Sequence, residues 1–206
     1  MLNVLLLCVS VTSGVTVNGL QNKFGKSKCK NKKDINYYNM ITFFVCMGVF
    51  AAVAILNGKI SLFTVLMGLA FGVFTFTSSY CKLVALSRGP MHVTTLIITT
   101  SMLIPTLSGP ILFPESEKFS IPKLIFAAVL IFFVYLLAKK DEKETSIKKG
   151  WIPMIAVAFL GSGFIGVMQK VHQSSEHKDE IFAFLAVSFA FSFAASLFTS
   201  RVNACR

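Results

Sequence analysis

Long apolar stretches without a charged residue constrain this chain more than any other feature. The clearest one, Met91–Phe113, contains no Asp, Glu, Lys or Arg. A charge-free apolar run of about 20 residues is long enough for a helix to cross a bilayer core of roughly 30 Å. Pro105, Gly109 and Pro110 interrupt it, and such residues are tolerated where neighbouring helices or a cavity re-satisfy the freed backbone groups. We therefore expect a membrane helix that packs on protein or lines a path.

Similar stretches recur along the whole chain and predict an all-α, polytopic membrane helix bundle. Only 14% of the residues are charged, compared with about 25% in typical soluble domains. Asn57-Gly58 is a turn signal after one stretch, and Trp151 is expected at the membrane surface as an aromatic anchor. We expect seven transmembrane helices, roughly Leu2–Leu20, Tyr37–Leu56, Ser61–Leu86, Met91–Phe113, Ile121–Ala138, Trp151–Lys170 and Glu180–Ser200.

The basic residues are distributed unevenly between the two sides that seven spans define. Fifteen of the 20 Lys and Arg residues fall on one side: Lys23, Lys26, Lys28, Lys30, Lys32, Lys33, Lys82, Arg88, Lys139, Lys140, Lys143, Lys148, Lys149, Arg201 and Arg206. Cytoplasmic loops carry the excess of positive charge in membrane proteins. The sequence therefore predicts a multi-pass protein of the plasma membrane with its N-terminus outside and its C-terminus in the cytoplasm.

The charge and the reactive residues exclude several functional classes. The net charge of +11 lies in loops that meet anionic lipid, and no nucleic-acid motif accompanies it, so we expect no nucleic acid as a partner. All nine acidic residues lie in loops or at span ends, which leaves no carboxylate at mid-membrane for a proton path. The five cysteines and three histidines are dispersed. We expect no cofactor, no metal site and no enzyme activity.

One glycine pattern invites a nucleotide-binding interpretation. Gly161, Gly163 and Gly166 fit the dinucleotide motif GxGxxG, but that motif requires a preceding strand and a soluble βαβ unit. Inside a membrane span, small residues let neighbouring helices approach closely. The pattern therefore predicts helix packing.

Neutral polar residues within the spans are the remaining candidates for a functional site. Any single Ser or Thr is better explained by a hydrogen bond between helices. As a group beside a span broken by Pro and Gly, they suit a polar cavity for an uncharged or zwitterionic solute. The candidate cavity residues are Asn18, Gln21, Tyr80, Thr95, Thr99, Ser101 and Gln169.

A faint internal repeat links the first and sixth spans. Each contains a Ser-Gly pair, a later Gly and a Gln near its end, at Ser13-Gly14 to Gln21 and at Ser162-Gly163 to Gln169. The two copies are five spans apart in chain order, so the second copy is inverted in the membrane. Inverted repeats are common in secondary transporters, although chance similarity between two apolar helices remains the alternative.

Several loose motifs carry a resemblance to a known family. They are Tyr80 with Ala85–Pro90 at the end of the third span, Ser101–Pro105 in the fourth, Glu117–Ser120 before the fifth, and Ala158–Gly163 with Gln169-Lys170 in the sixth. Together they resemble the EamA-like family of the drug/metabolite transporter superfamily. The resemblance implies a first five-helix repeat in residues 1–138, a basic cytoplasmic linker in 139–150 and a partial, inverted second repeat in 151–206.

The resemblance also implies a function. Members usually have ten helices and move a small metabolite or drug by alternating access, so we expect a transporter truncated after about seven helices, with the lipid bilayer and a small-molecule substrate as its partners. The alternative is a non-transporting, accessory membrane protein. In that case a homo-oligomer or a partner subunit would complete the bundle.

Overall fold

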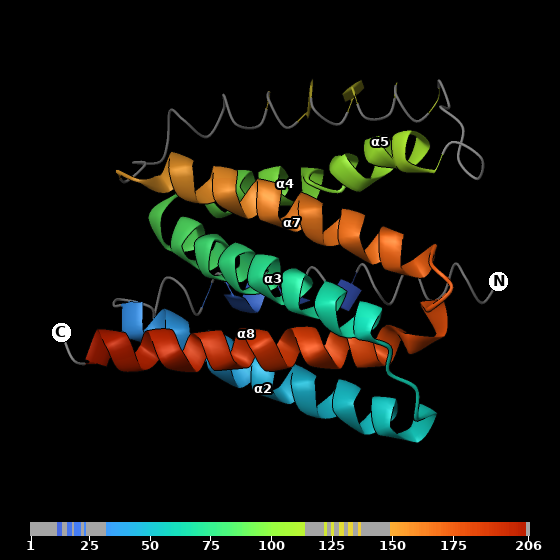
Figure 1. The fold of residues 1–206 in the computed structure, drawn as a ribbon. Helices are drawn as coiled ribbons and strands as arrows, with labels where there is room; N and C mark the ends of the chain where they lie inside the picture. Colours follow the sequence, from blue (N-terminus) through green and yellow to red (C-terminus); the bar gives the residue numbers. More distant parts are fainter. Residues whose placement is uncertain are drawn as a thin grey trace.

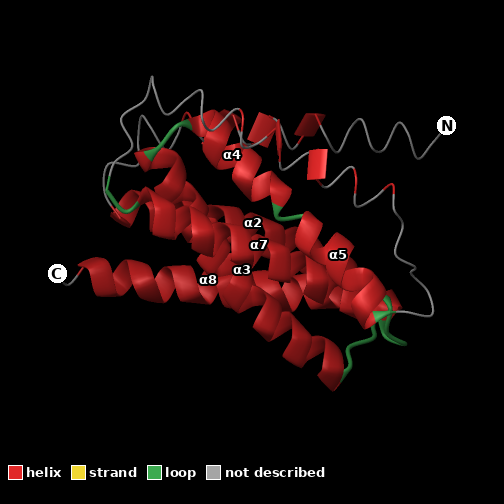
Figure 2. Ribbon diagram, turned by 90° about the horizontal axis from the view of Figure 1, so that it is seen from above, coloured by secondary structure: helices red, strands yellow, loops and turns green. Residues whose placement is uncertain are grey.

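The structure is a computed structural model, and it describes residues 32–113 and 149–204 together with scattered positions within 12–23 and 122–136. In the continuous ranges the chain forms helices joined by short turns, with no strand (Figures 1 and 2). The elements are α2 (Lys32–Asn57), α3 (Leu62–Arg88), α4 (Met91–Thr100), α5 (Leu103–Leu112), α7 (Trp151–Gln173), the 3-10 helix η1 (Lys178–Glu180) and α8 (Ile181–Ala204).

Five helices of the described residues are long and apolar enough to cross a membrane, where α4 and α5 count as one span. The expected count of seven is therefore not supported. The reason is that the first and fifth expected spans, Leu2–Leu20 and Ile121–Ala138, lie outside the continuously described residues. The all-α membrane class is confirmed by the five helices that are described.

The helices do not pack in chain order. Figure 1 shows α2, α8, α3, α7 and the α4–α5 pair following one another from bottom to top. Helix α3 packs chiefly against α7 and α8 and touches its chain neighbours α2 and α4 much less, while α2 packs chiefly against α8. The last two helices are thus inserted between the first ones, so that α3 contacts α7 on one side and α8 on another.

Small residues allow α3 and α8 to approach closely. A Cβ atom added at Gly68 would lie 3.0 Å from the carbonyl oxygen of Phe184, and one at Gly72 would lie 2.8 Å from that of Ser188. Ser192 Oγ donates a hydrogen bond of 3.0 Å to the Gly72 carbonyl. Because Gly68 and Gly72 meet successively later turns of α8, the two helices run parallel. Glycine and serine at one interface are typical of tightly packed membrane helices.

The glycine pattern of α7 serves the same purpose, which confirms the packing interpretation of GxGxxG. Gly161 lies against Ser78 of α3, and Gly163 and Gly166 lie against Ile104 and Pro105 of α5. Ser78 Oγ is 2.8 Å from Ser162 Oγ and donates to the Ala158 carbonyl at 3.1 Å. Helix α7 therefore presents one glycine to α3 and two glycines to α5.

The helix ends follow local chemistry. Gly58 has φ of 64° and donates to the Ala54 carbonyl at 3.1 Å, the left-handed C-terminal ending that glycine adopts without strain. This confirms the predicted Asn57-Gly58 turn. Helix α2 begins five residues before the expected Tyr37, because its first turn is the polar segment Lys32-Lys33-Asp34, which an apolar criterion misses.

The expectation that Trp151 anchors the protein at the membrane surface is wrong. Its side chain is only 8% exposed, and its Nε1 donates a 3.0 Å hydrogen bond to Thr94 Oγ1 of α4. The indole also lies directly against Gly89, at the end of α3. Trp151 is buried because Gly89 leaves room for the ring and Thr94 satisfies its polar edge, which a buried indole requires.

Contacts between helix ends sort the described turns into two groups. Gly89 touches Trp151, so the end of α3 and the start of α7 share one end of the bundle. Ser61 bonds Glu180, so the start of α3 and the start of α8 share the other end. Basic residues Lys33, Arg88, Lys149 and Arg201 belong to the first group. These four basic residues therefore lie at the same end of the bundle, as the order of the expected spans along the chain predicts.

Candidate functional site

The predicted cavity residues occupy different parts of the bundle. Tyr80 of α3 packs against two core clusters, one built around Leu83 and Val84 and one around Cys81 and Trp151. Thr95 and Thr99 lie on α4, Ser101 follows α4 directly, and Gln169 lies on α7. Gln21 is half-buried and its Oε1 has no hydrogen-bond partner. Asn18 lies outside the described residues.

Ser101 marks a break in the fourth span. Helix α4 ends at Thr100 and α5 begins at Leu103, as Figure 2 shows by the short connection between them. Pro105 has no N–H to donate to the carbonyl four residues earlier, and that carbonyl belongs to Ser101. The Ser101 carbonyl instead accepts from Ile104 N at 3.0 Å. The sequence predicted an interrupted helix, and the structure places the break one turn before the proline.

The threonines beside this break differ in environment. Thr99 is exposed, and its Oγ1 donates to the Thr95 carbonyl at 2.8 Å. Thr95 Oγ1 is buried without a partner, and Ser101 is only 3% exposed. Thr95 and Ser101 are therefore inside the bundle, while Thr99 lies on its surface. Whether these residues contact a solute remains a prediction.

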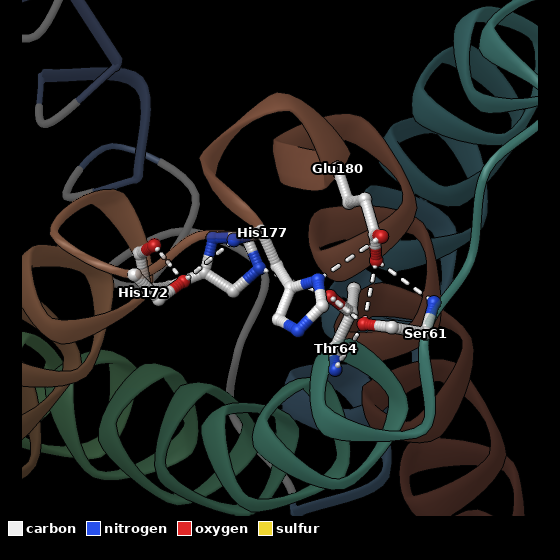
Figure 3. A network of polar contacts seen from close by, with 6 residues as sticks. Ser61, Thr64, His172, His177 and Glu180 are labelled. Carbon is white, nitrogen blue, oxygen red and sulfur yellow. Dashed lines mark hydrogen bonds and ion pairs between the residues drawn. The ribbon is translucent and has the colours of Figure 1, made fainter.

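A second polar group, which sequence reasoning missed, joins α3 to the α7–α8 connection (Figure 3). Ser61 precedes α3, and its Oγ accepts a hydrogen bond of 3.2 Å from Thr64 N. Glu180 Oε2 accepts two bonds of 2.8 Å, from the N–H and the hydroxyl of Ser61. His177 Nδ1 lies 3.4 Å from the other Glu180 oxygen. A carboxylate at a helix N-terminus is favoured by the helix dipole.

His172 extends this group into the bundle. Its Nε2 lies 3.3 Å from Thr64 Oγ1, while its Nδ1 has no partner. The ring stacks on Phe184 with centroids 4.4 Å apart. Both His172 and Thr64 are fully buried, so a substrate cannot reach the hydroxyl that the imidazole contacts. We call Ser61, Thr64, His172, His177 and Glu180 the terminal network, and its geometry is that of a structural link.

Metal binding finds no support in the described part of the chain, where no three His, Cys, Asp or Glu side chains come together. The terminal network contributes one carboxylate and two imidazoles, and only His177 contacts the carboxylate. A nucleophilic site would need a hydroxyl beside an oriented base and open to a substrate. Ser61 instead faces a carboxylate and a second hydroxyl.

Sequence reasoning also missed buried polar residues on α2 and α8. Asn36 and Asn39 are 0% and 1% exposed, and Ser188, Ser192 and Ser196 are fully buried. Two patterns could have found them: amides three residues apart at a span start, and serines at positions i, i+4 and i+8, which share one face of a helix. Asn36 fell outside the expected span because that span was begun at Tyr37.

Comparison with known proteins adds no assignment: no family model, no curated protein and no solved structure matches the chain.

Proposed function

We propose that this chain is a membrane transporter of the EamA-like class, which moves a small uncharged or zwitterionic solute by alternating access. The observation that carries the proposal is the broken α4–α5 span, whose break at Ser101–Met102 lies beside a buried serine. Discontinuous helices near the bilayer midplane form the substrate sites of many transporters. The resemblance in Tyr80–Pro90 and Ser101–Pro105 supplies the class.

The distribution of acidic residues argues against a cationic solute. The acidic residues of the continuously described helices and turns are Asp34, Glu176, Asp179 and Glu180, and all four lie in a first turn, a loop or the turn before α8. The buried polar side chains are those of Asn, Ser and Thr together with His172. A cationic substrate would lose its hydration without gaining an opposite charge, which is costly in a low-dielectric interior.

The finer architecture belongs to this proposal. We infer seven spans within residues 1–206, a first repeat of five helices followed by helices of a second, inverted repeat that starts with α7. The positive-inside rule places the basic end of the bundle in the cytoplasm and the N-terminus outside. The mechanism is a rocking of one repeat against the other around the cavity formed by the first, third, fourth and sixth spans.

Uptake into proteoliposomes tests the transport proposal. The full chain is reconstituted and given a panel of labelled neutral and zwitterionic solutes. Substitution Ser101→Phe fills the break and should abolish uptake without loss of membrane insertion, whereas Ile111→Ala, at an exposed position of α5, should leave uptake unchanged.

The outcomes separate the two functional classes. Uptake that Ser101→Phe leaves unchanged would contradict the cavity assignment. A correctly inserted wild-type protein that transports no solute in the panel would favour the accessory role, in which a second copy or a partner subunit completes the bundle.

A further inference from the structure

Two buried amides on α2 have polar atoms without hydrogen-bond partners. Asn36 and Asn39 are three residues apart, so they lie on one face of the helix. Asn39 Oδ1 accepts a 3.0 Å hydrogen bond from Ser79 Oγ of α3, but its Nδ2 has no partner. Both Asn36 side-chain atoms, Oδ1 and Nδ2, also have none. Nearly all buried polar groups in proteins are paired, so three such atoms on one helix face require an explanation.

Two buried hydroxyls lie at about the same height along the helix axes. Thr75 Oγ1 on α3 and Ser196 Oγ on α8 have no hydrogen-bond partner. Because α3 and α8 run parallel and Ser192 bonds Gly72, Ser196 lies one turn further along, level with the turn that contains Thr75. Ser79 follows Thr75 by one more turn and bonds Asn39. We call Asn36, Asn39, Thr75, Ser79 and Ser196 the amide site.

The amide site lies at the seam where α2 meets α3, and both helices also pack on α8. Helix α2 rests chiefly on α8 and has few contacts with α3. Towards the basic end of the bundle, an apolar cluster of Ile35, Leu83 and Val84 closes the seam. None of the five site residues is ionisable in the physiological range. The site therefore offers hydrogen bonds of both senses and carries no charge of its own.

The geometry points to a binding site, between α2, α3 and α8, for a small neutral solute that carries both hydrogen-bond donors and acceptors. A primary amide supplies two donors and an acceptor, so the unpaired atoms of Asn36 and Asn39 match a solute of mixed hydrogen-bonding character. This site is distinct from the predicted cavity, since only α3 is common to both. That its ligand is the transported solute rests on the proposed function, whereas binding itself needs no transport.

Ligand-observed NMR on the purified full chain in lipid nanodiscs tests the site. The probes are acetamide and acetate, which have nearly the same shape but differ in charge. Saturation transfer is expected to reach acetamide and not acetate. The Asn36→Leu/Asn39→Leu variant should lose the acetamide signal, and Gln173→Leu, which removes an exposed amide at the end of α7, should keep it.

A milder variant guards against misfolding of the double variant. Ser196→Ala removes one unpartnered hydroxyl and leaves both amides in place, and it should weaken acetamide binding about fivefold, as the loss of one hydrogen bond predicts. Equal acetamide binding by the wild type and Ser196→Ala would overturn the site, as would acetate binding as tightly as acetamide. Because no uptake is measured, failure of the site and failure of the transport proposal are distinguishable.

Discussion

Helix α3 meets α8 and α2 in two different ways. Against α8, glycine and serine bring the backbones together, and Ser192 donates to the Gly72 carbonyl. The start of α3 is also tied by Glu180, which precedes α8. Against α2, Ser79 of the same helix donates a hydrogen bond to Asn39, while the side chain of the nearby Asn36 has no partner.

The difference separates polar groups that hold the fold from polar groups that are available to a ligand. Where Ser192 bonds Gly72, a buried hydrogen bond with both partners present restricts the α3–α8 interface to one arrangement. Buried polar groups with no partner weaken the α2–α3 interface until something binds them. We therefore expect α3, α7 and α8 to form the fixed part of the bundle and the α2–α3 seam to be the part that opens.

The largest expected effect follows from filling the fixed interface. Gly72→Leu places side-chain atoms against the Ser188 backbone, which cannot retreat as a flexible side chain can. Overpacking of this kind costs about 1–3 kcal/mol, occasionally more. Unfolding in mixed detergent micelles should show this loss. Gly48→Leu, where a Cβ meets nothing within 4 Å, is the control and should unfold like the wild type.

A smaller loss is expected from the terminal network. Glu180→Ala removes the acceptor for two hydrogen bonds from Ser61 and leaves the N–H at the start of α3 unpaired. Loss of a side-chain hydrogen bond to the N–H groups at a helix start costs about 1–2 kcal/mol of stability. The same unfolding assay measures it, with Asp179→Ala at an exposed neighbouring position as the control. If both variants unfold alike, Glu180 does not stabilise the bundle.

Ser192→Ala should cost less again. It removes a hydroxyl that bonds the Gly72 and Ser188 carbonyls, and hydrogen bonds between membrane helices average about 0.6 kcal/mol. A loss above that of Glu180→Ala would show that the serines of α8 contribute more than packing and one hydrogen bond.

The smallest effect is expected at Asn36. Leu has nearly the shape of Asn, and Asn36→Leu breaks no side-chain hydrogen bond because both polar atoms are unpartnered. The free energy of unfolding should stay the same or rise, since an unpaired buried amide is lost. A destabilisation as large as that of Glu180→Ala would mean that the Asn36 amide holds the fold together. The contrast between the α3–α8 and α2–α3 interfaces would then not hold.

Sequence alone predicted those features that depend on local composition. The five described spans, the Asn57-Gly58 turn and the packing role of Gly161, Gly163 and Gly166 follow from apolar run length, turn chemistry and residue size. The interruption by Pro105 was also predictable, because a missing N–H has a local consequence. Its position at Ser101–Met102 follows from which carbonyl loses its donor.

Features that depend on which helices meet were not predictable. Trp151 was assigned to the membrane surface because nothing near it in the sequence reveals that Gly89 and Thr94 make room for the ring. The bond between Ser61 and Glu180 joins residues 119 positions apart. Asn36 and Asn39 form a site only because Ser79 of a different helix lies opposite them, and a one-dimensional pattern carries no such information.

The central claim is that the α3–α8 interface is fixed and that the α2–α3 seam opens. Distance measurement between spin labels tests it most directly. In a variant with Cys8, Cys29, Cys46, Cys81 and Cys205 replaced, a label at exposed Val73 of α3 is paired with Tyr37 of α2 or with Phe198 of α8. We predict one narrow distance distribution for Val73–Phe198, and a broad or double one for Tyr37–Val73 that narrows with acetamide. Two equally narrow distributions that acetamide leaves unchanged would contradict the account.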